Sequence, residues 1–351
     1  MSEKMNAYRM VSWGEKPQQV EVEKPSVAAG QVVIKVGGNG LCGSDPKMCK
    51  LTEEIGTMIQ WQMPFTLGHE AGGWVEEVGE GVVGLEKGDP VVLMSSSSCG
   101  KCSYCLEGND NNCDYGIYGR GYGRNGSLAP YVLVENPREI IKLNTLDPVT
   151  AGPLTDAAAT SYHGVKKALP KLKPGTTALV IGAGGLGSFA VQLVKALSPA
   201  RVVAVDTNPA RLDYVKGLGA DEVVDGTAEN SAELIQQAIG GDGAAAVFDF
   251  VGLDQTIEYG IANLRKGGMF VLVGSNGGSL NQQWYGTLPK DAEITTYQGQ
   301  TISDTQAVIA LAEAGLIRND VDIYPFSFIE EAFEKLETGQ LQGRAVIKME
   351  H

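Results

Sequence analysis

Two patterns of apolar and polar positions follow one another along this chain of 351 residues. Up to about Asp147, short runs rich in β-forming residues are bounded by glycine or aspartate, as at Gln31–Val36, Gly73–Val78 and Pro90–Met94. Runs of this length and composition predict strands. Because no long amphipathic helix interrupts them, we expect a compact, β-barrel-like first domain.

From Thr176 onward, apolar segments of strand length alternate with segments of helical pattern. The predicted strands are Ala178–Ile181, Val202–Val205, Glu222–Val224, Ala246–Phe250 and Met269–Val273. The predicted helices are Leu186–Leu197, Pro209–Leu218, Ser231–Ile239 and Thr256–Leu264. Buried strands that alternate with helices indicate an α/β fold with a parallel, doubly wound sheet.

The end of the chain predicts one more helix, Phe328–Leu336, and a last strand, Ala345–Lys348. This strand does not continue the alternation, so we expect the tail to return to the first domain. A chain of this length exceeds one ordinary core, which favours two domains. We place the first domain at residues 1–157, the second at 158–298 and the returning segment at 299–351.

A glycine-rich turn joins the first predicted strand of the second domain to its helix. Gly182, Gly184 and Gly187 have the spacing G-x-G-x-x-G, with Gly185 and Leu186 where the helix begins. The first glycine allows a tight turn, the second lets a pyrophosphate approach the backbone, and the third packs helix against strand. The helix N-terminus then presents free N–H groups to phosphates. The turn therefore predicts a dinucleotide site.

Asp206 ends the second predicted strand, at the position where dinucleotide-binding folds carry an acid. Its carboxylate suits the ribose hydroxyls of adenosine and repels a 2′-phosphate, so we predict NAD(H) rather than NADP(H). Asp206 is also suited to cap the helix that begins near Pro209. Arg211 is placed to accept a 2′-phosphate, and the sequence leaves these alternatives open.

Four cysteines, Cys99, Cys102, Cys105 and Cys113, lie close together on a loop rich in glycine, serine and asparagine. Four thiolates at this spacing are typical of a closed, structural zinc site with no open position for chemistry. An iron–sulfur cluster is the alternative, but the bacterial ferredoxin pattern has a shorter last gap and a following proline. Clustered cysteines indicate reduced thiols and a cytoplasmic protein.

Two further residues that could bind a metal lie in separate, glycine-flanked segments. Cys42 occurs in G-L-C-G-S-D and His69 in G-H-E-A-G-G. The chain has only 3 histidines, and a lone histidine is more often a core or turn residue than a ligand. The spacing of Cys42 and His69 does not by itself establish a site.

Taken in order, these motifs resemble those of the zinc-containing medium-chain alcohol dehydrogenases. The resemblance rests on G-L-C-G-S-D, on the glycines around His69 and Glu70, on the four-cysteine loop, on P-L-T-D ending at Asp156, and on the glycine turn with Asp206. It covers nearly the whole chain. The chain is most similar to bacterial secondary-alcohol dehydrogenases and aryl-ketone reductases, which share P-L-T-D-A and F-D-F-V-G. The resemblance implies a Rossmann domain joined to a GroES-like β-barrel catalytic domain.

The resemblance also implies two zinc ions per chain, one catalytic and one structural. Cys42, His69 and Asp156 would hold the catalytic ion, and Glu70 would be able to swing in as a further ligand. The oxygen ligand at Asp156, where many relatives have cysteine, is expected to make the ion a stronger Lewis acid. Ser44 would accept the substrate proton and relay it outward. The alternatives are a helix cap for Asp156 and a turn hydrogen bond for Ser44.

Other residues are assigned by the resemblance alone. Those that it places near the nicotinamide are Thr160, Phe250, Val273 and Gly274. It places Arg344 near the pyrophosphate, although an arginine more often pairs with a surface carboxylate. Those that it places at the substrate pocket are Trp61, Tyr297 and Gln298.

Two positions depart from the pattern of the family. Gly43 stands where many relatives carry a cationic side chain that contacts the phosphates, so one charge contact is missing. Lys47 stands where some members have a relay histidine, which leaves the outer proton path undefined.

Composition and charge narrow the partners. With 28 basic and 42 acidic residues, the formal net charge is −14, which disfavours nucleic acid and an anionic membrane surface. The segment Met1–Met10 lacks the apolar core of a signal peptide, and the apolar runs are too short to span a bilayer. We expect a small alcohol or ketone substrate and, because both occur among relatives, a homodimer or homotetramer.

The sequence therefore predicts a zinc- and NAD(H)-dependent interconversion of alcohols, secondary or aryl, with ketones or aldehydes. A polyol or amino-alcohol dehydrogenase of the same superfamily is the alternative that C-G-S-D favours. A non-catalytic zinc-binding scaffold that retains the fold is an alternative of a different class. It requires lost ligands or a spoiled glycine turn, and the sequence has neither.

Overall fold

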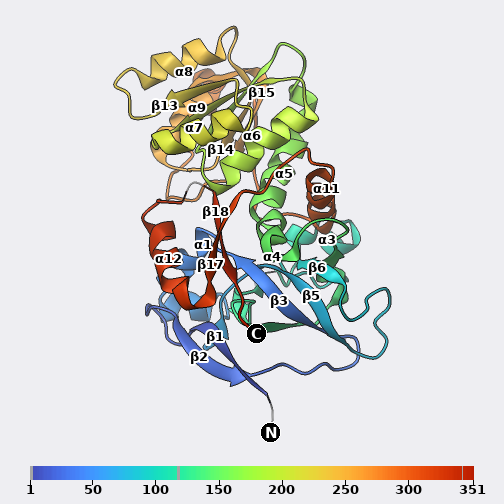
Figure 1. Cartoon of the computed structure of the whole chain (residues 1–351). Helices are drawn as coiled ribbons and strands as arrows, with labels where there is room; N and C mark the ends of the chain where they lie inside the picture. The colour runs from blue at the N-terminus through green and yellow to red at the C-terminus, as the bar shows by residue number, and fades with distance from the viewer. Residues whose placement is uncertain (1–2, 117–118, 342) are drawn as a thin grey trace. The chain divides into compact units, whose positions relative to one another are not determined.

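The chain folds into two compact units (Figure 1). The structure is a computed structural model and describes residues 3–116, 119–341 and 343–351. The first unit comprises Met1–Ala159 and Gly299–His351, and the second comprises Thr160–Gln298. The first unit is thus built from both ends of the chain.

A seven-stranded sheet forms the centre of the first unit. Its strands in spatial order are β10 (Ile140–Lys142), β6 (Pro90–Leu93), β5 (Glu70–Val78), β3 (Val32–Gly40), β18 (Arg344–Lys348) and β17 (Val321–Pro325), with β9 (Tyr131–Val134) paired to β3. All of its pairs are antiparallel except β17 with β18. Valine, isoleucine and leucine side chains of these strands pack into one buried core.

Smaller elements surround this sheet. A three-stranded sheet has the order β2 (Gln18–Glu23), β1 (Lys4–Met10), β4 (Phe65–Thr66), and a short pair is formed by β7 (Gly119–Arg120) and β8 (Gly123–Arg124). The helices are α1 (Ser44–Cys49), α2 (Glu53–Met58), α3 (Ser103–Leu106), α4 (Pro148–Ala151) and α5 (Ala157–Ala168), the last of which runs into the second unit. Single 3-10 turns occur at Asp110–Asn112, Pro137–Glu139, Gly152–Thr155 and Leu169–Lys171.

β3 and β5 are both longer than the sequence predicts. The predicted strand Gln31–Val36 continues to Gly40, and β5 begins at Glu70 rather than at Gly73. Glycines at these ends have the composition of a turn, but the structure uses them for close packing. A Cβ atom at Gly40, for example, would collide with the carboxylate of Glu70. The strand ends are therefore decided by what packs against them and not by β propensity.

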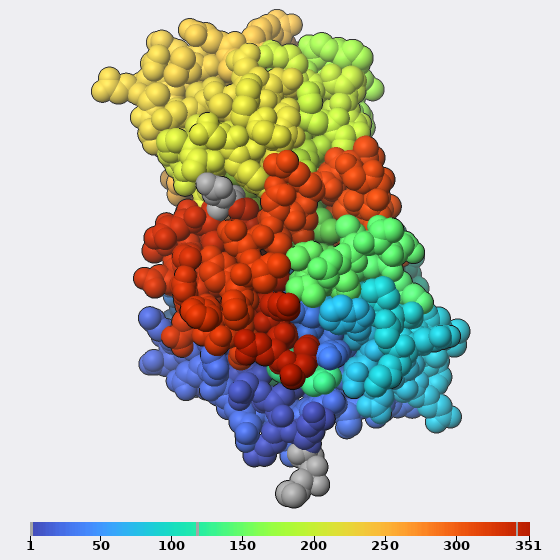
Figure 2. Space-filling model, viewed as in Figure 1, coloured from blue at the N-terminus to red at the C-terminus, as the bar shows by residue number. Residues whose placement is uncertain are grey.

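The C-terminal segment adds α11 (Ile302–Glu313), β17, a 3-10 turn at Phe326–Phe328, α12 (Ile329–Glu337) and β18. β18 pairs with β3, and in the space-filling view the red tail lies against the blue N-terminal part of the same unit (Figure 2). α11 is not among the helices predicted from the sequence. Its signal is a capping box, in which Thr301 and Asp304 each bond the backbone N–H of the other.

The second unit is a six-stranded sheet in which every pair is parallel. Its strands in spatial order are β13 (Glu222–Asp225), β12 (Arg201–Asp206), β11 (Thr177–Ile181), β14 (Ala244–Asp249), β15 (Leu264–Leu272) and β16 (Glu293–Thr296). Its helices are α6 (Gly185–Leu197), α7 (Pro209–Gly217), α8 (Ser231–Ile239), α9 (Asp254–Ala262) and α10 (Trp284–Thr287). The order reverses at β11, so right-handed crossovers put helices on both faces. The prediction of a doubly wound parallel sheet is confirmed.

The largest differences from the predicted boundaries in the second unit concern α9 and β15, which begins five residues before the predicted strand Met269–Val273. The helix predicted at Thr256–Leu264 is α9, which begins and ends two residues earlier, and Leu264 already starts β15.

Among the residues that the structure describes, no helix is long and apolar enough to cross a membrane.

Candidate functional site

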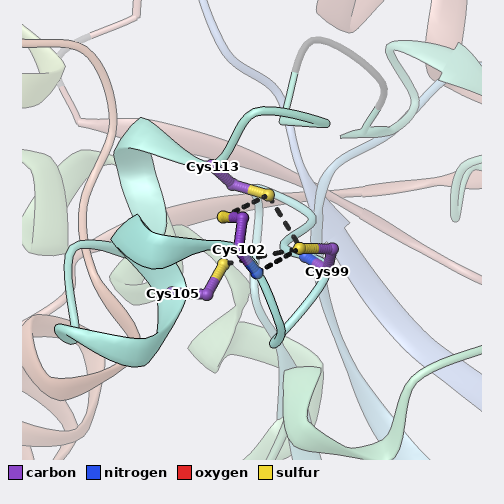
Figure 3. Close-up of side chains that lie close together, drawn as sticks. All are labelled: Cys99, Cys102, Cys105 and Cys113. Atoms are coloured by element: carbon purple, nitrogen blue, oxygen red, sulfur yellow. Dashed lines mark hydrogen bonds between the residues drawn. The ribbon is translucent and has the colours of Figure 1, made fainter.

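The four cysteines of the predicted zinc loop converge on one point in the first unit (Figure 3). The sulfur atoms of Cys99 and Cys105 lie 4.0 Å apart, and those of Cys102 and Cys113 lie 3.9 Å apart. A tetrahedral zinc with bonds of about 2.3 Å separates its sulfurs by roughly 3.8 Å, whereas a disulfide needs about 2.05 Å. The spacing of these thiols therefore fits a metal ion and excludes disulfides.

Backbone N–H groups point at two of these sulfurs. Cys99 Sγ accepts from the N–H groups of Lys101 and Cys102 at 3.4 and 3.3 Å, and Cys113 Sγ accepts from those of Cys99 and Tyr115 at 3.2 and 3.4 Å. The bond from Lys101 is the main reason that the pKa of Cys99 falls to about 6. Donors arranged in this way stabilise thiolates, which is the form that binds zinc.

Two ion pairs fix the strands and turns beside the cysteine loop. Arg120 and Glu139 form a buried pair at 3.0 Å, and Arg138 bonds Asp110 at 2.7 Å. Burial lowers the pKa of Arg120 and raises that of Glu139, which disfavours the charged form of each side chain. The opposite charge of the partner counteracts this effect in both. Glu139 also accepts from the N–H of Ser98, directly before the first cysteine. These contacts hold in place a loop that has little apolar core of its own.

The second predicted cluster also converges, from three distant segments of the first unit. Cys42 follows β3, His69 precedes β5, and Asp156 follows the turn at Gly152–Thr155. Cys42 Sγ lies 3.2 Å and His69 Nε2 lies 3.8 Å from Asp156 Oδ2. With Glu70, the four side chains place one ligand atom each within 4.8 Å of one another. Thiolate, imidazole and carboxylate in this arrangement match the three protein ligands of a catalytic zinc.

Acidic and basic neighbours support this cluster. The other ring nitrogen of His69, Nδ1, faces Asp45 at 3.4 Å, which is the outer-shell contact that orients a metal-binding histidine. Asp45 also accepts from the N–H of Cys42 at 2.8 Å. Arg344 forms an ion pair with Glu70 and lies 3.5 Å from Asp156. Arg344, predicted from the resemblance to contact a pyrophosphate, thus lies among the metal-ligand candidates and is 5% exposed.

Ser44 begins α1, two residues after Cys42. The turn hydrogen bonds that were the alternative role for Ser44 are made by its neighbour Asp45. The Ser44 hydroxyl instead lies 2.9 Å from the hydroxyl of Tyr122, which lies 3.1 Å from His69 Nε2. Burial raises the pKa of Tyr122 well above its usual value. Ser44 and Tyr122 therefore place two neutral hydroxyls beside the cluster.

The glycine turn of the second unit has the geometry that its spacing predicts. Gly182 follows β11 directly with φ +88°, a conformation that favours glycine. A Cβ atom at Gly187 would overlap the carbonyl oxygen of Gly182. α6 therefore begins hard against the end of β11, where the first N–H groups of a helix can meet an anion.

Asp206 is tied to the same turn. Its carboxylate accepts from the N–H of Ala183 at 2.7 Å and from that of Asn208 at 2.9 Å. Asn208, and not Asp206, caps α7, because the Asn208 side chain accepts from the N–H of Ala210. Arg211 lies 4.0 Å from Asp206. The helix-cap alternative for Asp206 is therefore wrong, and its carboxylate is held at the carboxyl ends of β11 and β12.

Three of the four residues assigned to the nicotinamide lie at the carboxyl end of β14 and beyond β15, whereas Thr160 lies in α5. Phe250 donates its N–H to the carbonyl of Ile181, and the N–H groups of Val273 and Gly274 both donate to the carbonyl of Asp249 at 2.9 Å. The Asp249 carboxylate is fully buried and accepts from the N–H groups of Val251 and Gly252, at 2.8 and 2.9 Å. Asp249 thus bonds both the segment that follows β14 and the segment that follows β15.

Two of the remaining assigned residues meet in the second unit. The Tyr297 hydroxyl donates to the carbonyl of Thr160 at 2.6 Å, and its ring lies 4.7 Å from that of His163. Gln298 is exposed at the end of this unit. Trp61 lies in the first unit, with its ring 6.0 Å from that of Tyr122.

Comparison with known proteins bears on both units. Residues 28–145 match the alcohol dehydrogenase GroES-like domain, and residues 185–314 match the zinc-binding dehydrogenase domain. An NAD-dependent alcohol dehydrogenase of Sulfurisphaera tokodaii is 34% identical over 98% of this chain and 99% of its own. The chain belongs to the zinc-containing medium-chain alcohol dehydrogenase family. The predicted family, the GroES-like domain and the assignment as an oxidoreductase are thereby confirmed.

Two further relatives extend the comparison. The alcohol dehydrogenase of the hyperthermophilic archaeon Aeropyrum pernix superposes with a TM-score of 0.89 at 32% identity, covering 98% of this chain and 99% of its own. A D-arabinose 1-dehydrogenase (NADP(+)) of Saccharolobus solfataricus is 32% identical over 93% of both chains. The enzyme thus has relatives that differ in both substrate and cofactor.

Three residues that the structure brings into these sites were not predicted from the sequence. Asp45 and Asp249 stand inside motifs already recognised, G-L-C-G-S-D and F-D-F-V-G, so an acid within a glycine-bounded motif was the available signal. Tyr122 has only the flanking glycines Gly121 and Gly123. Its approach to Ser44 depends on the fold, and no local pattern predicts it.

Proposed function

We propose that the enzyme is a zinc- and NAD(H)-dependent dehydrogenase that interconverts alcohols, secondary or aryl, with ketones or aldehydes. The observation that carries this proposal is the convergence of Cys42, His69 and Asp156 from three distant segments. The same chain supplies a glycine turn on a parallel sheet, where a dinucleotide binds in folds of this kind. The family membership is consistent with both.

Cys42, His69 and Asp156 are proposed to hold the catalytic zinc, with Glu70 as the residue able to replace an outer ligand. Zinc held there would supply Lewis acidity, which stabilises negative charge on a substrate oxygen. Asp45 orients His69 through Nδ1, and Arg344 neutralises Glu70 while that carboxylate is withdrawn. In reduction, Ser44 donates its hydroxyl proton to the substrate oxygen and takes up one proton from solvent, and oxidation reverses both transfers.

The dinucleotide is proposed to bind the second unit. The turn from Gly182 to Gly187 would hold its pyrophosphate, and Asp206 would accept hydrogen bonds from the ribose hydroxyls. Thr160, Phe250, Val273 and Gly274 are assigned to the nicotinamide, and Arg344 to the pyrophosphate. When bound, NAD(H) would supply or accept the hydride, and these residues would bind and orient the cofactor.

The preference for secondary or aryl substrates rests on the first unit. Tyr122 puts an aromatic ring 4.6 Å from that of His69, and the Trp61 ring lies 6.0 Å from that of Tyr122. Phe65 packs against Trp61 from the buried core, with its ring 5.7 Å away. Flat, apolar substrate groups pack well on such side chains. Tyr297 and Gln298 are the pocket candidates of the second unit.

An NADH-oxidation panel tests this function. Purified enzyme is assayed with aliphatic ketones, acetophenones, aldehydes and sugars, and its zinc content is measured alongside. We expect the highest kcat/KM with a ketone that bears an aryl or branched apolar group. Activity that is independent of zinc, or none with any carbonyl compound, would contradict the proposal.

A sugar or polyol dehydrogenase is the second candidate. Its support is the D-arabinose dehydrogenase relative, together with the C-G-S-D segment in which Gly43 replaces a phosphate-binding cation. In the same panel, this candidate predicts a higher kcat/KM for oxidation of aldoses or polyols than for any simple secondary alcohol.

We expect a preference for NADH that depends on the charge of Asp206. The wild-type kcat/KM should be roughly tenfold or more higher with NADH than with NADPH, because the carboxylate repels a 2′-phosphate. Asp206→Asn keeps an oxygen acceptor for the turn and removes the charge, so the ratio should approach one. Asp225→Asn changes the residue that pairs with Asp206 in the neighbouring strand and serves as control. A wild-type preference for NADPH would refute the assignment.

The four-cysteine loop is proposed to hold a structural zinc. Cys102→Ser should lower the zinc content from about two to about one per chain and the melting temperature by about 10 °C. The kcat of the folded variant should stay within about threefold of wild type, because a closed four-cysteine site has no position open for chemistry. Equal zinc content in variant and wild type, or complete loss of activity in a folded variant, would argue against this role.

A homodimer or homotetramer remains part of the proposal. The second unit exposes Trp284 and Tyr285 of α10 by 75% and 80%, and Ile294 of the edge strand β16 by 37%. An open strand edge beside exposed apolar side chains is a surface that a second copy can cover. Light scattering after gel filtration gives the subunit number directly.

A further inference from the structure

Tyr122 is held in a fixed position beside the metal-ligand candidates of the first unit. It lies in the turn between β7 and β8, and the flanking Gly121 and Gly123 both have φ +74°. A Cβ atom at Gly123 would come within 2.6 Å of the Trp61 ring. The Tyr122 ring packs 4.6 Å from the ring of His69. The rings of both Trp61 and His69 thus contact the tyrosine.

The hydroxyl of Tyr122 points into the cluster. Among the described residues, it makes hydrogen-bond contacts with Ser44 Oγ at 2.9 Å and with His69 Nε2 at 3.1 Å. Nε2 is the nitrogen that faces Asp156, whereas Nδ1 faces Asp45. When a metal ion uses the Nε2 lone pair, Ser44 is the contact that remains for the Tyr122 hydroxyl.

Either of the two hydroxyls could donate the hydrogen bond between Ser44 and Tyr122, and the two directions have different consequences for the substrate. Each hydroxyl has one hydrogen and two lone pairs. If Ser44 donates to Tyr122, its hydrogen is turned away from the substrate. If Tyr122 donates to Ser44, the Ser44 hydrogen is free to point at the substrate oxygen, and a Ser44 lone pair is oriented as well.

We propose that Tyr122 is a positioning residue that donates its hydrogen bond to Ser44 and so aims the Ser44 hydroxyl at the substrate oxygen. The inference rests on the proposed role of Ser44. It assigns no proton transfer to Tyr122, which keeps its hydrogen throughout. Some relatives have a relay histidine at the position of Lys47, and here Lys47 is exposed. The outer neighbour that orients Ser44 here comes from the β7–β8 turn instead.

A double-mutant cycle with Tyr122→Phe and Ser44→Ala tests the inference. Phenylalanine keeps the ring and its packing and removes only the hydroxyl. Tyr122→Phe should lower kcat for ketone reduction about tenfold, the effect of one oriented hydrogen bond, with little change in ketone KM. In the Ser44→Ala background, Tyr122→Phe should add less than about twofold, because residues that act in series are not additive. Tyr115→Phe, which changes an exposed tyrosine that precedes β7, is the matched control.

Three measurements besides turnover keep a structural role apart from a positioning role. Zinc content, NADH affinity by fluorescence titration and melting temperature should match wild type in Tyr122→Phe. Loss of zinc from Tyr122→Phe, an unchanged kcat, or the same tenfold effect with and without Ser44 would overturn the inference. If Ser44→Ala is inactive and Tyr122→Phe is fully active, only the inference fails. If Ser44→Ala is fully active, the proposed role of Ser44 fails with it.

Discussion

Cys42→Ser should reduce kcat/KM by about a thousandfold or more while the affinity for NADH stays within about twofold of wild type. The substitution replaces a thiolate, a charged and soft zinc ligand, by a neutral hydroxyl at the centre of the cluster. Losses of ten- to a hundredfold are usual when only an outer-shell partner of a metal ligand is removed. The removal of a ligand itself should therefore cost more.

The geometry of the first unit explains why the effect should be confined to chemistry. Cys42 contacts Asp156 through its sulfur and Asp45 through its N–H, and both partners belong to the first unit. The glycine turn belongs to the second. Zinc content should fall from about two to about one per chain, and the remaining ion should belong to the four-cysteine loop.

Cys49→Ser is the matched control for Cys42→Ser. Cys49 lies seven residues away at the end of α1, is partly buried, and donates to the carbonyl of Asp45 without joining either metal cluster. It should retain both zinc ions and nearly full activity. A Cys42→Ser enzyme that turns over at the wild-type rate would end the proposal of a catalytic metal at this place.

Gly187→Ala should weaken NADH binding by about a hundredfold or more and leave both metal clusters loaded. A Cβ atom at this position would overlap the carbonyl oxygen of Gly182 and come within 3.4 Å of Val180. α6 then has to move away from β11. The first N–H groups of α6 are displaced from the position in which they can bond the pyrophosphate. Small displacements matter here because a helix N-terminus binds an anion only at short range.

Gly217→Ala provides the control within the same unit. Gly217 is the last residue of α7, and a Cβ atom there meets nothing within 4 Å. Alanine is the better helix former, so this variant should be as stable as wild type or slightly more so. Fluorescence titration with NADH and metal analysis separate the two variants. Unchanged NADH affinity in Gly187→Ala would remove the dinucleotide from this turn.

Cys42→Ser and Gly187→Ala together make opposite predictions for the two units. The first is expected to lose metal and turnover but keep NADH, and the second is expected to lose NADH but keep metal. If either variant lost both zinc and NADH without unfolding, the assignment of separate roles to the two units would be wrong.

The sequence by itself determined the features that depend on neighbours along the chain. The alternation of apolar strands with helices after Thr176 predicted a parallel sheet, because that alternation is a local consequence of burying both faces. The G-x-G-x-x-G spacing and the four-cysteine loop were recognised for the same reason, since each lies within one turn or one loop. The family resemblance added His69, Cys42 and Asp156 as a ligand set.

Only the tertiary structure decided which distant groups meet. It placed Tyr122 against Ser44, Asp45 against His69, and Arg344 against Glu70, although each pair is joined by no local pattern. It also extended β3 through glycines that look like a turn, because those glycines make room for other segments. Close packing and the pairing of buried charges depend on the whole fold, so a local pattern of residues does not predict them.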